Sequence, residues 1–282
     1  MHTSEQNDFN LASWRAKGAP LAALLTALAA VVFLPAGAAA AWELKVCGDP
    51  NRMPFSHADG TGLENRVAKI LADEMGATVT YVWFPASEAA VQDFLRTGQC
   101  DVMMAIEDGH PLVTPTLAYF RSPFVFIQRA DRPYRIEMFD DPKLKELKVG
   151  MQPPGGPTQE AFEVRGLGQR IKEFYQFEID TIVKDVANQT IDVGVAWGPA
   201  AGYFAARSEV PVIVLPVTPE FEPPFTPMFL NMVIGFRRGE ESIRDLFDIA
   251  IATRWEDIQQ VLTELDIPLM PLAAPILTME RL

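Results

Sequence analysis

The chain has 282 residues, and its 37 aspartates and glutamates outnumber its 24 lysines and arginines, so its formal net charge is −13. Such an acidic surface repels the phosphates of nucleic acids and of anionic lipids, which argues against a nucleic-acid-binding protein. The sequence contains two cysteines and three histidines, with no CxxC motif and no pair of histidines at ligand spacing. We therefore expect no metal site.

The first 41 residues have the layout of a secretory signal. Arg15 and Lys17 precede an apolar run at 21–34, and small residues follow this run up to Ala41. The run is shorter than the roughly 20 residues that span a bilayer, which disfavours the alternative of an uncleaved membrane anchor. We expect the signal peptide, residues 1–41, to be removed on export, and we expect the mature protein not to insert into a membrane.

Strands and helices alternate in the part that follows. The strand segments are apolar, β-branched or aromatic, and the helical segments have apolar residues at three- and four-residue spacing. Repeated strand–helix–strand units form parallel sheets with right-handed crossovers, so we expect such a sheet here. The predicted strands lie at 44–48, 78–84, 101–106 and 123–129, and the predicted helices at 62–75 and 85–97.

A second unit of the same kind follows a break at 130–133. After this unit, a strand at 232–236 is expected to return the chain to the first unit, and a long amphipathic helix is predicted at 240–265. The predicted elements of the second unit are strands at 148–151, 174–178, 191–196 and 210–216, and helices that begin at 158 and span 180–189.

These elements predict an α/β protein with two lobes, each a mainly parallel sheet flanked by helices. Lobe 1 is expected to comprise residues 42–130 and 232–282, and lobe 2 residues 131–231. Two proline-rich segments, at 216–227 and 268–277, stand apart from this pattern. Proline excludes a regular helix or an interior strand, so both should be extended on a surface, where each either packs along its own protein or docks on a partner.

Cys47 and Cys100 leave two alternatives open. In an oxidising compartment, two cysteines suggest one disulfide. If the strands that hold them are parallel neighbours, however, an offset of several residues at about 3.3 Å each would exceed the roughly 7 Å between Cα atoms that a disulfide allows. The alternative is a pair of small buried side chains.

The loop at 48–56 follows the first predicted strand and contains Asp49, Pro50 and Phe55. Open α/β sheets bind ligands at the carboxyl ends of their strands, so this loop predicts a cleft. Glu107 would face the same cleft from the end of the third strand. Asp49 and Glu107 could act as acid and base or bind a cation, but no partner base or nucleophile is identifiable, and capping of loop amides is the favoured alternative. We assign no catalytic residue.

Aromatic and cationic side chains supply the other candidates for the cleft. Phe55, Trp197 and Tyr203 offer apolar and stacking surface, although aromatic residues also commonly belong to the core. Trp197 is expected to reach the cleft because Gly198 and a proline end its strand abruptly. Arg121 is either the cation of the cleft or a bridge from a strand end to the neighbouring loop.

Three strings carry a resemblance to a known family: Val-Cys-Gly-Asp-Pro-Asn at 46–51, Pro-Phe-Ser at 54–56, and Asp-Val-Gly-Val-Ala-Trp-Gly-Pro-Ala-Ala-Gly-Tyr-Phe at 192–204. Together with the order of the elements, they resemble the type II periplasmic solute-binding fold. Within it they are similar to the binding-protein-like components associated with quinoprotein (methanol) dehydrogenases, in the lanthanide-dependent branch. The resemblance covers nearly all of the chain after residue 41.

The sequence departs from amino-acid receptors of this fold at both charged groups that hold the ligand. Those receptors usually carry an arginine after the third strand to pair with the ligand's carboxylate, but segment 107–115 has two acids and no arginine. The usual acidic partner of the ligand's amine is replaced by the Trp-Gly-Pro string at 197–199. The resemblance therefore does not imply an amino-acid receptor.

What the resemblance implies is a periplasmic accessory protein, not an enzyme, that serves a methanol dehydrogenase dependent on pyrroloquinoline quinone (PQQ). It would assist maturation or activation of that dehydrogenase through protein–protein contact and would bind no cofactor itself. The alternative is a receptor that delivers a small neutral or aromatic compound to an ABC importer, with that compound bound in the cleft.

Overall fold

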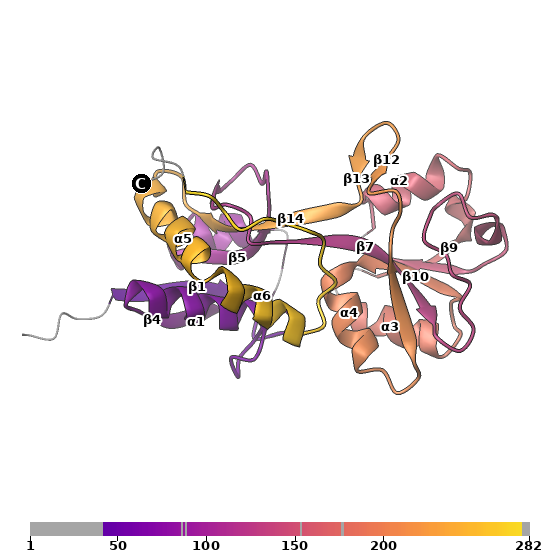
Figure 1. Ribbon diagram of the computed structural model, residues 1–282, viewed down its shortest axis with the longest axis horizontal. Coiled ribbons are helices and arrows are strands. Elements are labelled where there is room, and N and C mark those ends of the chain that lie inside the picture. Colours follow the sequence, from indigo (N-terminus) through magenta and orange to yellow (C-terminus); the bar gives the residue numbers. More distant parts are fainter. Residues whose placement is uncertain (1–41, 86, 88, 153, 176–177, 278–282) are drawn as a thin grey trace, which may run out of the picture. The chain divides into compact units, whose positions relative to one another are not determined.

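The computed structural model describes residues 42–277 except for 86, 88, 153 and 176–177. The predicted signal peptide, 1–41, lies outside the described residues. The described chain is an α/β protein with two lobes joined by two strands, which confirms the predicted fold class (Figure 1). In this part of the chain, every helix is too short or too polar to cross a bilayer.

The sheet of lobe 1 is built around β1 (Trp42–Gly48), which pairs in parallel with β4 (Ala77–Trp83) and with β5 (Val102–Glu107). Helix α1 (Leu63–Met75) connects β1 to β4 and ends at Gly76, whose φ of 68° is a left-handed conformation that glycine adopts without steric penalty. The helix predicted at 85–97 is a single π-helical turn among the described residues. The turn spans Val91–Leu95, and the short strands of this region are β2 (Asn51–Arg52), β3 (Ser56–His57) and β6 (Thr114–Pro115).

The sheet of lobe 2 has β10 (Val193–Trp197) beside β8 (Val149–Met151), with β9 (Ile171–Phe174) on the far side of β8, all in parallel. β11 pairs with β7 in the same sheet, and β12 and β13 form a separate two-stranded hairpin. Their bounds are Val212–Pro216, Phe221–Glu222 and Thr226–Pro227. The helices are α2 (Pro157–Glu163), α3 (Ile179–Ala187) and α4 (Gly198–Ala206), with 3-10 turns at Pro142–Lys145 and Gly168–Arg170.

Two long antiparallel strands, β7 (Phe120–Arg129) and β14 (Phe229–Phe236), connect the lobes (Figure 1). β14 pairs with β5 in lobe 1, and its first residues pair with the beginning of β7. From Phe124 onward, β7 pairs with β10 and β11 in lobe 2. The sheet is thus continuous, in the order β4-β1-β5-β14-β7-β10-β8-β9.

The strand pairing changes lobes earlier than the sequence predicted. We expected the chain to leave lobe 1 after residue 130, but the second half of β7 already belongs to the sheet of lobe 2. The physical reason is that this half is apolar on both faces: Phe124 and Phe126 enter one core of lobe 2, whereas Val125 and Ile127 enter the other.

The long C-terminal helix predicted at 240–265 is two helices, α5 (Glu241–Thr253) and α6 (Trp255–Glu264). The break falls at Arg254, whose guanidinium forms ion pairs with Asp257 of α6 at 2.5 Å and with Glu74 of α1 at 3.5 Å. Both helices and α1 pack their apolar faces on the sheet of lobe 1. The amphipathic period continues through the break, so the pattern alone does not reveal it.

The proline-rich tail after α6 lies along the connecting strand β7. The hydroxyl of Ser122 donates to the carbonyl oxygen of Pro268 at 2.6 Å, and the amide of Met270 donates to the carbonyl oxygen of Arg121 at 3.0 Å. Further along, Leu272 packs against the core of lobe 1. Of the two alternatives for the tail, packing along its own protein is therefore the arrangement in the structure.

The same tail also contacts α4 of lobe 2. Arg207 forms an ion pair with Asp266 at 2.8 Å. Gly202 lies so close to the tail that a Cβ there would come within 2.3 Å of the carbonyl oxygen of Asp266 and 2.5 Å of Pro268. Only glycine permits this approach. The tail thus touches both lobes and one of the strands between them.

Candidate functional site

Phe55 reaches from lobe 1 into lobe 2 and lines the cavity between the lobes. It belongs to the loop after β1 in lobe 1, yet its side chain is 5% exposed and packs among core residues of lobe 2. Its ring stacks on that of Trp197, at the end of β10, with centroids 5.7 Å apart and planes 7° apart. Trp197 is held in turn by Phe120, at 6.3 Å between ring centroids, and by its indole N–H, which donates to the carbonyl oxygen of Ser122 at 3.2 Å.

Hydrogen bonds fix the loop that carries Phe55. The Asp49 amide donates to the Ser56 hydroxyl at 3.1 Å, and that hydroxyl donates to the Asp49 carbonyl oxygen at 2.8 Å. The Asp49 carboxylate accepts from the amide of Asn51 at 2.9 Å. The carboxylate therefore makes the loop-capping contact that was one of its two predicted roles. The guanidinium of Arg52 lies over the Phe55 ring, 5.1 Å from its centroid.

A cavity of about 510 Å³ lies beside Phe55, between the two lobes. The loop after β1 forms one wall, and α3, α4 and the turn after β8 form the other. Its lining mixes charged, amide and apolar groups, so it could take a small molecule with both polar and apolar parts. Its lining residues include Asp49, Arg52, Gln152, Asp180 and Phe204.

A second cavity of about 400 Å³ extends from Asp49 and Arg52 into lobe 1. Its walls include Glu107, as predicted from the sequence, and Glu64, which the sequence did not single out. The sequence does hold a signal for Glu64: it lies in the first turn of α1, where an acid suits the helix dipole. This cavity is where the structure brings Asp49 and Glu107 together.

Desolvation raises the pKa of both glutamates in this second cavity, although only Glu64 is buried. Desolvation raises the pKa of Glu64 to about 7, against the opposing charge of Arg52 and the hydrogen bond with Ser56. Desolvation also raises the pKa of Glu107, partly offset by the nearby His110. With its pKa at about 7, Glu64 retains its proton for part of the time at neutral pH.

The remaining predicted residues do not line either cavity. Arg121 donates to the side-chain oxygen of Asn231 at 2.7 Å and lies over the Phe229 ring at 4.5 Å, so it bridges β7 and β14. Gly198 lies against Ser122 in the connecting strand. Tyr203 packs on the core of lobe 1 beneath the guanidinium of Arg207. The carbonyl oxygen of Pro50 accepts a hydrogen bond from the amide of Ala58.

Cys47 and Cys100 form a disulfide, with their Cα atoms 5.4 Å apart. The offset argument predicted a larger separation and was wrong on this point. It assumed that Cys100 lies in the strand, whereas β5 begins only at Val102 and the preceding turn brings Cys100 back beside β1. Cys47 lines the second cavity, directly behind the Asp49 loop.

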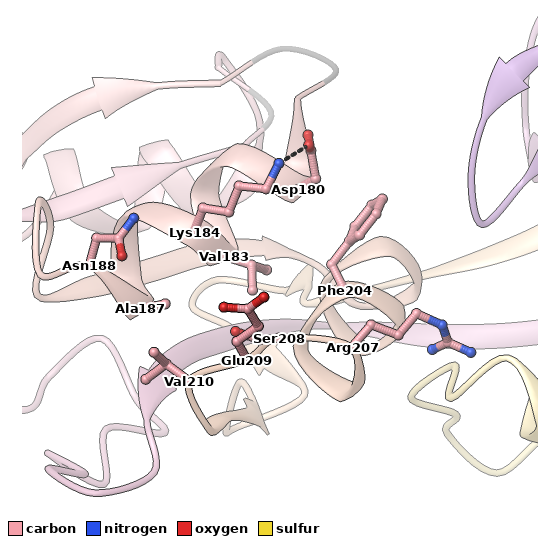
Figure 2. A pocket seen from close by; sticks show the side chains of 10 residues that line it. All are labelled: Asp180, Val183, Lys184, Ala187, Asn188, Phe204, Arg207, Ser208, Glu209 and Val210. Carbon is pink, nitrogen blue, oxygen red and sulfur yellow. Dashed lines mark hydrogen bonds and ion pairs between the residues drawn. The ribbon is translucent and has the colours of Figure 1, made fainter.

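A third hollow lies on lobe 2 between α3 and α4, with a volume of about 390 Å³ (Figure 2). Figure 2 shows Phe204 at one end and Lys184 bonded to Asp180 along the α3 side. Asp180 and Phe204 also line the cavity between the lobes, so the two hollows adjoin. In the described residues, no three His, Cys, Asp or Glu side chains are grouped to hold a metal ion.

Comparisons with known proteins find that this chain is similar to proteins named MoxJ, XoxJ and MxaJ. Protein MoxJ from Methylorubrum extorquens is 29% identical over 252 residues, which are 83% of this chain and 83% of MoxJ. The periplasmic binding protein XoxJ from Methylobacterium extorquens AM1 has 31% sequence identity with this chain, and its crystal structure matches with a TM-score of 0.68. The match covers 81% of this chain and all of XoxJ. The chain belongs to the MoxJ/XoxJ family of methanol-oxidation-associated periplasmic binding proteins.

A further match supports the fold of this MoxJ/XoxJ family member. The crystal structure of MxaJ from Methlophaga aminisulfidivorans MPT has a TM-score of 0.73 and 24% identity, and covers 80% of this chain and all of MxaJ. No protein-family model matches the chain. The resemblance stated from the sequence is thus confirmed at the level of the family.

Proposed function

We propose that this MoxJ/XoxJ family member is a periplasmic accessory protein of a PQQ-dependent methanol dehydrogenase, of the lanthanide-dependent type that the sequence resemblance implies. It assists maturation or activation of the dehydrogenase through protein–protein contact. It catalyses no reaction of its own, and PQQ and the metal belong to the dehydrogenase. Its N-terminal segment directs it to the periplasm and is then removed.

The observation that carries this proposal is the position of Phe55. A solute receptor of this fold holds its ligand between the lobes, where polar groups fix the ligand's orientation. In this chain the Phe55 side chain packs between the lobes, in the core of lobe 2, and stacks on Trp197. Segment 107–115 also lacks the arginine that would pair with a carboxylate. Both features favour a protein that acts through its surface over one that carries an amino acid.

A second candidate function has one observation in its favour. The cavity of about 510 Å³ beside Phe55 is large enough for a small neutral or aromatic compound. In that case the chain would be a receptor for an ABC importer. A compound present at 100 times its dissociation constant would stabilise the fold by about 2.7 kcal/mol, which a thermal-shift screen of small solutes detects.

Deletion of the gene in its source organism tests the first proposal. We expect the deletion strain to lose dehydrogenase activity in periplasmic extracts and growth on methanol with lanthanides supplied, and to recover both when the wild-type gene is restored. Uptake of small solutes should be unchanged. Full dehydrogenase activity in the deletion strain would overturn the proposal, whereas a lost solute uptake with intact dehydrogenase would favour the receptor.

A further inference from the structure

Four large apolar side chains are exposed together on lobe 2, and we call them the hairpin patch: Met138, Val164, Phe221 and Phe225. Their exposed fractions are 47%, 71%, 50% and 86%. Phe221 and Phe225 belong to the β12–β13 hairpin, which lies beside α2 (Figure 1). The four residues make up half of the eight large apolar side chains that are exposed in the described part of the chain.

One ion-pair network joins the three segments that carry the hairpin patch. Arg165, next to Val164, binds Glu222 of the hairpin at 2.6 Å and Asp140 at 2.8 Å. Its guanidinium also lies 5.7 Å from the ring centroid of Phe139, the neighbour of Met138. The segments that carry Met138, Val164 and Phe221 are therefore neighbours on lobe 2.

The hairpin is held in place beneath its exposed side chains. Glu222 is 4% exposed and paired with Arg165, so the base of the hairpin is buried in the protein. The amide of Met228 donates to the carbonyl oxygen of Glu220 at 2.8 Å and closes the hairpin. Two consecutive prolines restrict the turn before Phe225. A side chain presented on a fixed backbone loses little conformational entropy when a partner binds it.

The charge around the hairpin patch selects the kind of partner. Segments 135–141, 163–165 and 218–228 contain six carboxylates and two arginines, and one of these arginines is already paired within the network. The rim is therefore acidic around an apolar centre. Anionic lipid and a second copy of this acidic chain would both be repelled. A protein with an apolar pocket and a rim of lysines and arginines fits this surface.

We propose that the hairpin patch is the docking surface for the methanol dehydrogenase, with Phe225 inserted in an apolar pocket of that partner and the acidic rim paired with its lysines and arginines. The proposal rests on the proposed function for the identity of the partner. It adds that docking occurs through the β12–β13 hairpin of lobe 2 and not through the cavity beside Phe55.

Binding of purified full-length mature protein to the purified dehydrogenase of the same organism, with and without its cofactor, tests this proposal. Phe225→Ser should raise the dissociation constant about tenfold or more, as expected for a central aromatic anchor. The matched control is Ile276→Ser, because Ile276 is also 86% exposed but lies in the C-terminal tail. Replacing Glu137 and Glu220 by Gln should slow association and reduce its dependence on salt.

The outcomes separate this proposal from the proposed function. If the wild-type protein binds the dehydrogenase and Phe225→Ser binds as tightly as Ile276→Ser, the hairpin patch is not the docking surface, although the proposed function stands. If neither form of the dehydrogenase binds the wild-type protein, both proposals fail together. If Phe225→Ser instead changes the oligomeric state of the isolated protein in sedimentation, the patch joins copies of this chain and the proposal is overturned.

Discussion

Phe55 and Trp197 come from different lobes, and their rings lie parallel, with 5.7 Å between centroids. Such aromatic pairs contribute about 0.5–1.5 kcal/mol beyond the burial of their area. Because Phe55 is also buried among core residues of lobe 2, it holds the lobes together. The contact should also restrict movement of one lobe relative to the other, since the lobes are otherwise connected mainly by β7, β14 and the C-terminal tail.

Phe55→Ala should loosen the contact between the lobes. Truncation of a buried phenylalanine costs about 3–5 kcal/mol of unfolding free energy, and here part of that contact joins the lobes. We expect a lower urea midpoint and a larger radius of gyration in small-angle X-ray scattering. Phe162→Ala is the matched control, because Phe162 is fully buried within lobe 2 and its loss should lower the midpoint without changing the radius. Equal radii for wild type and Phe55→Ala would contradict the role given to Phe55.

Glu64 should make the protein less stable as the pH rises. Its pKa in the fold is about 7, raised by burial from the ordinary 4.5. Between these two values the folded protein retains a proton that the unfolded chain has lost, so the free energy of unfolding falls as the pH increases, by roughly 3 kcal/mol in total. The contribution of Glu64 to the free energy of unfolding is therefore full below pH 4.5 and is lost as the pH rises through 7.

Glu64→Gln is the variant that checks this dependence, because the amide is close in shape and cannot ionise. Urea midpoints measured between pH 5 and pH 8 should fall less steeply for the variant than for the wild type. Thr97→Ser, a change at an exposed residue that does not line the second cavity, should keep the wild-type slope. An identical slope for Glu64→Gln would show that Glu64 does not retain its proton in the fold.

The sequence predicted most of the strands and helices along each lobe, because strand and helix periods differ and glycines mark helix ends such as Gly76. It did not predict the burial of Glu64, because amphipathic patterns identify buried apolar positions and give no signal for a buried acid. It predicted Phe55, Asp49 and Trp197 at the cleft; Phe55 and Asp49 line the cavity between the lobes, whereas Trp197 stacks on Phe55 and lines neither cavity. That Phe55 would cross into the core of the other lobe depends on how the lobes meet, which no local pattern encodes.

The C-terminal helix and the disulfide show the same limit. The apolar stripe continues across Arg254, so the sequence pattern does not show the break there. At this position Arg254 forms an ion pair with Glu74 of α1, which is distant in sequence. The distance between Cys47 and Cys100 depended on the turn before β5, and the regular spacing of an ideal strand gave the wrong value. Both errors arise where long-range geometry overrides a local rule.

The disulfide should contribute substantially to stability. Cys47 and Cys100 are 53 residues apart in sequence, and in the chain-entropy model closing a loop of this length stabilises the fold by about 4 kcal/mol. We expect the urea midpoint of the wild type to fall after reduction with dithiothreitol. A variant with both cysteines replaced by Ala should have the lower midpoint with or without reductant. If reduction left the urea midpoint of the wild type unchanged, the result would contradict the disulfide between Cys47 and Cys100.

Gly202→Ala should displace the C-terminal tail. The new Cβ would overlap the carbonyl oxygen of Asp266 and the ring of Pro268, and such overpacking costs about 1–3 kcal/mol. We expect faster cleavage of the tail by a broad-specificity protease. Gly168→Ala is the control, since the nearest atom to a Cβ there is a side-chain carbon of Glu163 at 3.5 Å, an ordinary contact. Equal cleavage rates in both variants would mean that the tail is not held at α4.

Phe55 is carried by the loop after β1 but buried among core residues of lobe 2. Any movement that separated the lobes would expose this benzyl group to water and break its stacking on Trp197. Opening of the molecule therefore carries a free-energy cost set by one aromatic side chain.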